Sequence, residues 1–402
     1  MLPLEFARGR VRAVLHEIQR LKDADFPYGH SRDALVQLEH VIRERLKLLN
    51  SLTEANKADV IRTVCSETLL QMFRYFPLLG FILRSTNVRN SFEIFGPLLR
   101  LARSVLGSNT KLIVSSEWNF SPHVYKPIPV LPGFVLLGLP ASESGNPLLV
   151  PLAGHELGHT TWQSQKLDET FRPAIEISIM EQATKRKDEY KHLFGKDLND
   201  LFAAQDLSLA YTWALKQCEE SFCDFLGLRI FSESYLFAFA YLATPGVNHR
   251  SPVYPSMKDR VGNLVTAAQS YKVEVPTKFG DWFSDEITGP TNDKESFLLQ
   301  VGDNARRGAT INLMAAANNI VVKANLPERS TSKIEGVLAS FKLLTPASEV
   351  GDLANILNAA WAASRDPKLW EGQVDDRVET LNELVLKSIE ILEFETRTKV
   401  TT

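Results

Sequence analysis

The stretch His155-Glu156-Leu157-Gly158-His159 contains two histidines four residues apart, with a glutamate directly after the first. On an α-helix, residues at i and i+4 lie on one face, so both imidazoles can point at a single metal ion. Glu156 would then lie beside a water molecule at a zinc ion, and zinc lowers the pKa of such a water to about 7. The pattern predicts a zinc site with His155 and His159 as ligands and Glu156 as the general base.

The residues that precede this stretch favour a buried helix over a solvated one. Residues 146–154 are uncharged and mostly apolar, which fits a helix that begins against a protein core. The alternative is an ordinary surface helix whose histidines are merely solvated. Such a helix seldom follows so apolar a segment, so we favour the metal site.

The third ligand distinguishes the classes of zinc site that share this motif. One class has a third histidine six residues after the second, but Gln165 occupies that position here, and Trp162 replaces the glycine of that class. Another solution is a carboxylate from a second helix, with an acid one turn later that accepts a hydrogen bond from a zinc-bound histidine. Glu220 and Asp224 are four residues apart on one face of a second expected helix. We expect Glu220 to be the third zinc ligand and Asp224 to orient a histidine.

Other acids along the chain fit this role less well. Glu219 has Cys223 at the same spacing, and a thiol is a weak hydrogen-bond partner. The acids nearer the histidines have no acceptor four residues later; these acids are Glu169, Glu176 and Glu181. Glu220 and Asp224 could instead be exposed helix carboxylates. The helix around them is apolar over most of its circumference, however, and burying an unpaired carboxylate is costly.

The pattern resembles the gluzincin clan of zinc peptidases, through His155, Glu156, His159, Glu220 and Asp224. The separation of the two motifs is more similar to that in the family of prenyl-protein (CAAX) proteases and bacterial heat-shock membrane peptidases than to that in thermolysin, whose glutamate lies closer. The resemblance covers about residues 130–272. It implies a zincin-like catalytic core, a Zn²⁺ cofactor and a peptide or protein substrate.

A third block, from Tyr254-Pro255 to Arg260, extends the resemblance. That family has His-Pro followed by an arginine that leads into a helix. By this likeness Tyr254 stands in place of a histidine that contacts the transition-state oxyanion, and Arg260 matches the arginine. A tyrosine hydroxyl can donate a hydrogen bond to an oxyanion. Tyr254 and Arg260 are therefore candidate catalytic residues, while a plain helix start at Pro255 is the alternative for this block.

Hydrophobic periodicity predicts a mainly α-helical protein with a small β-sheet. Apolar residues recur at helical spacing from 11 to 21 and from 35 to 46. Two short strands are expected at 111–115 and 133–139, and either could bind a peptide as an added strand or simply lie in the core. We expect three regions: an N-terminal helical region (1–110), the catalytic core (111–275) and a C-terminal helical region (276–402).

Composition narrows the partners and the compartment. The charges nearly cancel, with 45 Lys+Arg against 48 Asp+Glu, so we expect no nucleic-acid partner. The longest apolar stretches, residues 75–83 and 235–244, are too short to span a bilayer, and no secretory signal is visible at the start of the sequence. Three cysteines provide no disulfide framework and are typical of a reducing compartment. We therefore expect a cytoplasmic protein without a membrane span.

Three hypotheses about function remain. The leading one is a zinc-dependent metallopeptidase that hydrolyses peptide bonds with a metal-activated water. A second is a non-catalytic, zinc-stabilised binding or regulatory protein. A third is a zinc hydrolase that acts on a non-peptide amide. The sequence does not indicate an oligomeric state.

Overall fold

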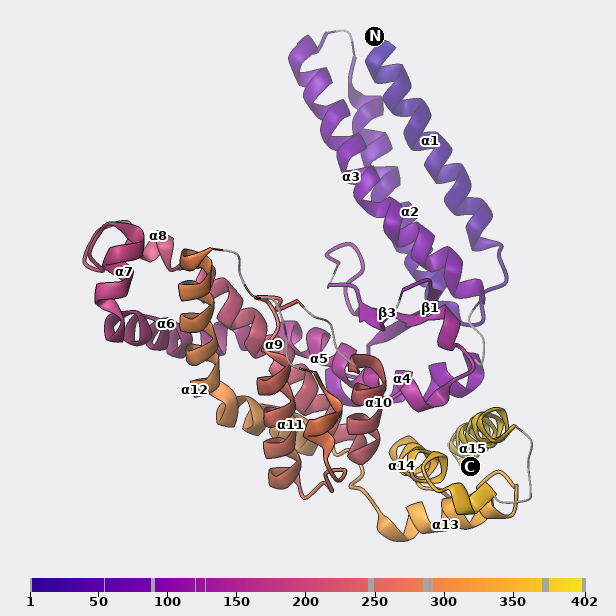
Figure 1. The fold of residues 1–402 in the computed structure, drawn as a ribbon. Helices are drawn as coiled ribbons and strands as arrows, with labels where there is room; N and C mark the ends of the chain where they lie inside the picture. Colours follow the sequence, from indigo (N-terminus) through magenta and orange to yellow (C-terminus); the bar gives the residue numbers. More distant parts are fainter. Residues whose placement is uncertain are drawn as a thin grey trace. The chain divides into compact units, whose positions relative to one another are not determined.

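The computed structural model confirms the predicted fold class, because helices make up most of the chain and one small sheet accompanies them (Figure 1). Phe120 and residues 245–248, which belong to loops expected from the sequence, lie outside the described residues. The structure describes residues 2–53, 55–87, 91–119, 121–126, 128–244, 249–284, 289, 292–370 and 376–399.

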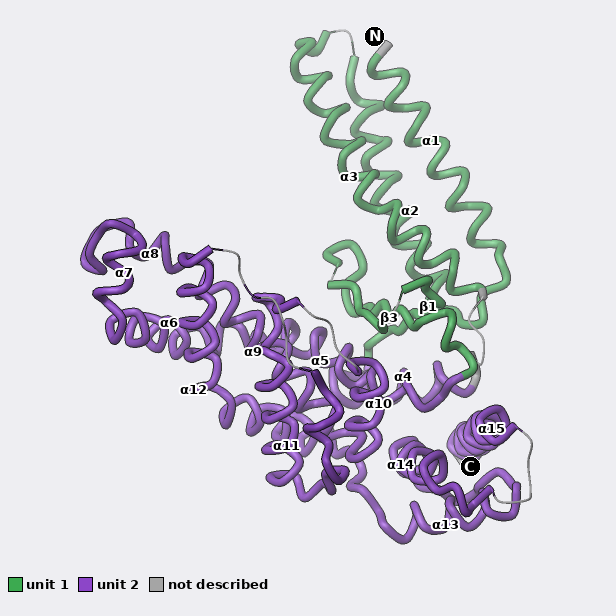
Figure 2. The backbone as a smooth tube through the Cα atoms, in the orientation of Figure 1, with its two compact units in different colours: residues 1–91, 109–145 green, residues 92–108, 146–402 purple. Residues whose placement is uncertain are grey.

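The chain forms two compact units, coloured separately in Figure 2. Unit 1 comprises residues 1–91 and 109–145, and unit 2 comprises residues 92–108 and 146–402. The division into three regions at residues 110 and 275 stays a prediction.

Unit 1 contains three long helices whose apolar faces pack together. On the first helix, the buried residues recur every three or four positions, as amphipathic packing requires. They include Leu4, Ala7, Val11, Leu15 and Ile18. The helices are α1 (Leu2–Lys22), α2 (Gly29–Ser51) and α3 (Ala58–Arg84), followed by the short turn η1 (Ser85–Asn87).

The sheet of unit 1 has the strand order β1-β3-β2. β1 (Lys111–Glu117) and β3 (Phe134–Pro140) run parallel, with Lys111 opposite Phe134, and β2 (His123–Val124) is antiparallel to β3. Both predicted strands are therefore present and pair with each other. Consecutive residues are buried along both strands, as in strands that are covered on two faces. Peptide binding at an edge of this sheet stays a prediction.

Helix α9 (Ser208–Phe231) is the centre of unit 2. Every residue from 217 to 228 on this helix is buried, so its polar side chains need partners inside the protein. The helices that contact α9 include α5 (Leu152–Ser164), α6 (Leu167–Lys185), α10 (Glu233–Ala243), α11 (Met257–Tyr271), α12 (Asp293–Lys323) and α14 (Leu353–Ser364).

Helix α4 (Ser91–Leu106) belongs to unit 2 from Phe92 onward, and a side chain of α4 contacts α15 (Arg377–Lys399). Arg100 forms an ion pair with Glu393, whose side chain is 2% exposed and also accepts from Arg397 at 2.7 Å. A Cβ atom at Gly96 would collide with the Glu393 carboxylate in its observed position, so this side chain would have to move. This buried acid and its two arginines therefore join the two helices.

The remaining helices of unit 2 complete its outer layers. None of the helices in the described part of the chain is both long enough and apolar enough to cross a lipid bilayer. The remaining helices of unit 2 are α7 (Lys187–Phe194), α8 (Ala203–Asp206) and α13 (Thr331–Lys342). Short 3₁₀ turns also occur: η2 (Ala141–Glu143) in unit 1, and η3 (Pro147–Leu149), η4 (Phe279–Trp282) and η5 (Pro367–Trp370) in unit 2.

Candidate metal centre

Two glycines let helices α5 and α9 approach closely. A Cβ atom on Gly158 would lie 2.7 Å from the Cα of Cys223, and one on Gly154 would lie 3.0 Å from the Cα of Gly227. Separations this short cannot be accommodated by turning a side chain, because the opposing atoms belong to the backbone. Gly154 and Gly158 directly precede His155 and His159 in the chain. The glycine contacts therefore bring both histidines against α9.

His155 lies between two carboxylates of α9. Its Nδ1 is 2.9 Å from Oδ1 of Asp224, and its Nε2 is 3.4 Å from Oε2 of Glu220. An imidazole that donates from Nδ1 to a carboxylate has its lone pair on Nε2, which is the tautomer that binds a metal through Nε2. The position of Asp224 therefore fits the orienting role expected from the sequence.

His159 has the same arrangement with different partners. Its Nδ1 is 3.0 Å from Oε1 of Glu219, and its Nε2 is 3.7 Å from Oε1 of Glu220. Both Nε2 atoms therefore face one carboxylate, that of Glu220, while both Nδ1 atoms are occupied by other acids. The structure brings together the three residues that the sequence analysis proposed as metal ligands.

A further set of contacts holds Asp224 in place. Arg260 donates from Nε at 2.5 Å and from Nη2 at 2.8 Å, and the Tyr235 hydroxyl donates at 2.7 Å. Burial opposes the ionisation of Asp224, but the charge and hydrogen bonds of Arg260, with His155 also contributing, lower the pKa of its carboxyl well below the ordinary value. Asp224 is thus a carboxylate at neutral pH and can accept a hydrogen bond from His155.

The Tyr254 ring lies beside Arg260 and within the electrostatic reach of Glu220. The guanidinium carbon of Arg260 is 5.5 Å from the centre of the Tyr254 ring. The negative charge of Glu220, together with burial, raises the pKa of Tyr254 to about 12, and Glu156 contributes in the same direction. The Tyr254 hydroxyl therefore keeps its proton at neutral pH and can donate a hydrogen bond.

The segment that carries Tyr254 is anchored to two helices. Arg250 donates to the carbonyl oxygens of Ser251 and Tyr254 and pairs with Asp303 of α12 at 2.7 Å. Gln217 of α9 donates from Nε2 to the carbonyl oxygen of Pro252 at 3.0 Å. These contacts fix the backbone on which Tyr254 stands next to α9.

The charges around the histidines favour a divalent cation. Four buried carboxylates belong to this region: Glu156, Glu219, Glu220 and Asp224. Arg260 pairs with Asp224 and Lys216 pairs with Glu219, so these two acids have cationic partners. Burial opposes a charge on His155, yet its hydrogen bonds and attraction to Asp224 and Glu220 raise its pKa to about 10. The surroundings thus stabilise positive charge at the imidazoles.

The Glu220 carboxylate has an unsatisfied oxygen where a metal would bind. Among the described residues, the buried Oε2 of Glu220 has no hydrogen-bond partner, although Nε2 of His155 lies 3.4 Å away. A buried carboxylate oxygen without a partner is costly, and a cation between Oε2 and the imidazoles would satisfy it. Two imidazole nitrogens and one carboxylate are a ligand set that zinc accepts with a fourth position open. The residues present therefore fit Zn²⁺.

Cys223 is a competing third ligand, because its sulfur lies within 4.8 Å of ligand atoms of both histidines. Burial raises the pKa of the Cys223 thiol well above its ordinary value, and the nearby carboxylates, Glu220 first, raise it further. A thiolate would add a negative charge to a region that already contains four buried carboxylates. Cys223 also fills the contact with Gly158. This charge argument favours Glu220 over Cys223 as the third ligand, and Cys223 is a small buried residue in the contact between α5 and α9.

Sequence reasoning missed three contributors. Glu219 was considered only as a ligand with Cys223 one turn later, whereas it contacts His159 across the helix pair. Two zinc-bound histidines need two acceptors, and that requirement could have pointed to the acid next to Glu220. Lys216 and Tyr235, which contact Glu219 and Asp224, carry no local signal, because their contacts depend on how the helices pack.

The chain matches no protein-family model, no curated protein and no solved structure in the comparisons made with each.

Proposed function

We propose that this protein is a zinc-dependent metallopeptidase of the gluzincin type, with His155, His159 and Glu220 as zinc ligands. The observation that carries the proposal is the orientation of the two imidazoles. Each Nε2 faces an oxygen of Glu220, at 3.4 and 3.7 Å, while each Nδ1 is hydrogen-bonded to a different acid. A pair of solvated helix histidines would not need these four contacts with three acids.

Zinc bound to these residues supplies a Lewis acid and a water of lowered pKa. Glu156 follows His155 on α5 and its side chain is 9% exposed. In the proposed reaction its carboxylate takes a proton from the water as the water oxygen bonds to the peptide carbonyl carbon. Glu156 then donates that proton to the amine nitrogen as the C–N bond breaks. Atoms balance as one water added across one peptide bond.

Tyr254 and Arg260 differ in what their positions allow. The protonated Tyr254 hydroxyl can donate a hydrogen bond to the oxygen on which negative charge develops. Arg260 directs Nε and Nη2 at Asp224, so we assign to it the positioning of Asp224 and, through Asp224, of His155. Direct contact of Arg260 with the oxyanion, as the family resemblance implies, would have to come from Nη1.

The proposal includes a cytoplasmic location and a peptide or protein substrate. The three cysteines are buried free thiols, which suits a reducing compartment. The substrate class rests on the gluzincin resemblance and on Glu156 and Tyr254, a base and a hydrogen-bond donor that lie in the same region as the candidate metal ligands.

The decisive experiment combines zinc analysis with digestion of a peptide library by the full chain. Glu156→Gln should keep the zinc content of the wild type and lose about 10²–10⁴-fold in hydrolysis, because it removes only the base. His155→Ala should lose zinc. Glu169→Gln is a matched control, because Glu169 is an exposed acid on α6 that pairs with the exposed Lys166.

Each contrary outcome has a defined meaning. Full hydrolysis by Glu156→Gln would contradict the mechanism, and an unchanged zinc content in His155→Ala would contradict the ligand assignment. Zinc without hydrolysis of any peptide or amide would favour a zinc-stabilised binding protein. Hydrolysis of small amides alone would favour the non-peptide hydrolase.

A further inference from the structure

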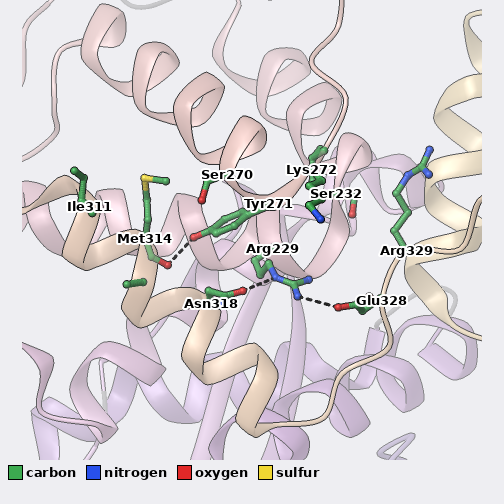
Figure 3. Close-up of a pocket in the computed structure, with 12 residues that line it drawn as sticks. Arg229, Ser232, Ser270, Tyr271, Lys272, Ile311, Met314, Asn318, Glu328 and Arg329 are labelled. Carbon is green, nitrogen blue, oxygen red and sulfur yellow. Dashed lines mark hydrogen bonds and ion pairs between the residues drawn. The ribbon is translucent and has the colours of Figure 1, made fainter.

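A cavity of about 600 Å³ lies in unit 2, at the C-terminal end of helix α9 and between α11 and α12 (Figure 3). Arg229 of α9 projects into it, nine residues beyond Glu220. At the helical rise of 1.5 Å per residue, the two positions are about 13 Å apart along the axis. None of the proposed metal ligands lines this cavity. It is therefore a separate place from the candidate metal centre.

The cavity has a charged end and an apolar end. Figure 3 shows Lys272, Glu328 and Arg329 toward one side and Ile311 and Met314 toward the other. Ile311, which is 77% exposed, offers an aliphatic side chain to a ligand at the apolar end. A ligand that matched both ends would have a charged head and an apolar body.

The charged end has an excess of positive charge. Arg229, Lys272 and Arg329 line it, against a single acid, Glu328. Glu328 is 87% exposed and lies 3.7 Å from Arg229, so it screens Arg229 only weakly. Arg329 is paired with Glu233 at 2.8 Å, which leaves Arg229 and Lys272 as the cations that a ligand could contact.

The Arg229 side chain is held in place through its Nε, while its Nη atoms donate no hydrogen bond within the described residues. Its side chain is 18% exposed, its Nε donates to Oδ1 of Asn318 at 2.9 Å, and its guanidinium carbon lies 6.0 Å from the ring centre of Tyr271. The Tyr271 ring is itself fixed, since its hydroxyl donates to the carbonyl oxygen of Met314 at 2.7 Å. A fixed guanidinium whose Nη1–Nη2 edge makes no hydrogen bond within the described residues, and has only an exposed acid 3.7 Å away, is suited to an oxyanion.

Helix polarity accounts for only part of this arrangement. Basic side chains are favoured in the last turn of a helix, which explains Arg229 near the end of α9 and Lys272 at the end of α11. It does not explain the cavity between them, the apolar wall opposite, or the unfilled hydrogen-bond capacity of Arg229.

We propose that this cavity binds a small organic acid, with a phosphate or carboxylate group on Arg229 and Lys272 and an apolar body against Met314 and Ile311. The phosphate monoester and the carboxylate share the chemistry that the site recognises, which is a compact oxyanion on an apolar body. The proposal does not depend on the metal centre being occupied or catalytic.

Titration calorimetry of the full chain tests this with four probes. Phenyl phosphate and benzoate carry both parts, inorganic phosphate carries only the head, and benzyl alcohol only the body. We expect saturable binding of phenyl phosphate or benzoate with a Kd below about 1 mM, and at least tenfold weaker binding of the two partial probes. Which of the two complete probes binds more tightly distinguishes a phosphate site from a carboxylate site.

Variants assign the binding to this cavity. Arg229→Gln and Lys272→Asn should each weaken binding about tenfold; asparagine suits the left-handed backbone of residue 272, whose φ is 57°. Lys323→Gln removes the same charge from an exposed site outside the cavity and should leave the affinity unchanged. Repeating the titration with a chelator separates this cavity from the metal centre, because binding here should persist.

Three results would overturn the proposal. The first is no saturable binding of either complete probe. The second is equal affinity in the wild type, Arg229→Gln and Lys272→Asn. The third is loss of all binding on chelation, which would place the anion at the metal centre instead.

Discussion

Glu219 is a buried acid with His159 on one carboxylate oxygen and Lys216 on the other. Burial opposes its ionisation, but hydrogen bonds from His159 and Lys216 lower its pKa to about 2. Glu219 is therefore a carboxylate at neutral pH and can accept a hydrogen bond from the Nδ1–H of His159. Acceptors behind metal-bound histidines commonly change metal affinity by 10- to 100-fold.

We therefore predict that Glu219→Ala weakens zinc binding about 10- to 100-fold, measured by competition with a chromophoric chelator. Glu219→Gln keeps an acceptor oxygen and should lose less. Glu181→Gln, at an exposed site on α6, should bind zinc like the wild type. Equal affinities in all four proteins would show that Glu219 has no part in the metal site.

Tyr254 offers a second test at the scale of one atom. Tyr254→Phe removes only the hydroxyl, so we predict unchanged zinc content and a kcat lower by about 10²- to 10³-fold, the usual effect of losing one oxyanion donor. KM should change little, because the donor acts on charge that develops during the reaction. Tyr241→Phe, at a tyrosine that is 51% exposed on α10, is the control. An unaltered kcat in Tyr254→Phe would favour the plain helix start at Pro255.

At the scale of helices, the glycines of α5 set the distance to α9. Gly158→Ala would place a methyl group 2.7 Å from the Cα of Cys223, so the helices must separate. We predict a loss of about 1–3 kcal/mol in the free energy of unfolding, as for other overpacked sites, together with weaker zinc binding. Denaturant unfolding and zinc competition measure the two effects.

The matched control is another helical glycine. A Cβ atom at Gly308, which is exposed on α12, meets nothing within 4 Å. Gly308→Ala should therefore stabilise the protein by about 0.5–1 kcal/mol, the ordinary gain for alanine in a helix. If Gly158→Ala behaved like Gly308→Ala, the close approach of α5 and α9 would not determine the geometry of the histidines.

Helices α1 and α2 of unit 1 are joined by a buried acid whose effect depends on pH. Glu39 accepts from Lys22 at 2.5 Å and from Arg43 at 2.5 Å. The hydrogen bond from Lys22, with that from Arg43 and against the effect of burial, lowers the pKa of Glu39 below its ordinary value of 4.5. Because the pKa of Glu39 is lower in the folded protein, its ion pairs contribute fully to stability above pH 4.5, the ordinary pKa. That contribution is lost as the pH falls from there through the lower pKa of the folded protein.

We predict that Glu39→Gln lowers the free energy of unfolding by about 0.5–1 kcal/mol at pH 7 and by less at pH 3. Thermal unfolding of both proteins at the two pH values gives the comparison. A deficit that grew as pH fell would contradict the assigned ion pair.

The contrast between α5 and α9 explains what the sequence could predict. Residues on one helix obey a fixed spacing, so His155 with His159 and Glu220 with Asp224 could be paired from the sequence alone. Contacts between helices obey no such spacing. The hydrogen bond between Glu219 and His159 depends on how closely α5 approaches α9 at Gly158. The hydrogen bond between Tyr235 and Asp224 depends on the turn between α9 and α10. Neither could be predicted from local pattern.

At the scale of the whole molecule, the sequence predicts the fold class but not which segments of the chain make up each unit. Helical periodicity and two short apolar runs were enough to predict helices with a small sheet. Unit 1, however, is made of two segments, with residues 92–108 between them belonging to unit 2. Within this interrupting segment, Arg100 pairs with the buried Glu393, nearly three hundred residues further along the chain. Periodicity within a segment contains no information about so distant a partner.

Because the chain forms two units, the effect of metal binding on one unit can be measured against the other unit as a reference. A ligand that binds the folded state at a concentration 100 times its Kd stabilises that state by about 2.7 kcal/mol. Zinc on His155, His159 and Glu220 would link α5 to α9, both of which belong to unit 2. We predict that a chelator speeds amide hydrogen exchange in α5 and α9 by up to about 100-fold and leaves α1, α2 and α3 unchanged. Glu220→Gln should exchange rapidly in these helices with or without the chelator. Equal acceleration in both units, or none in α5 and α9, would show that no metal joins these two helices.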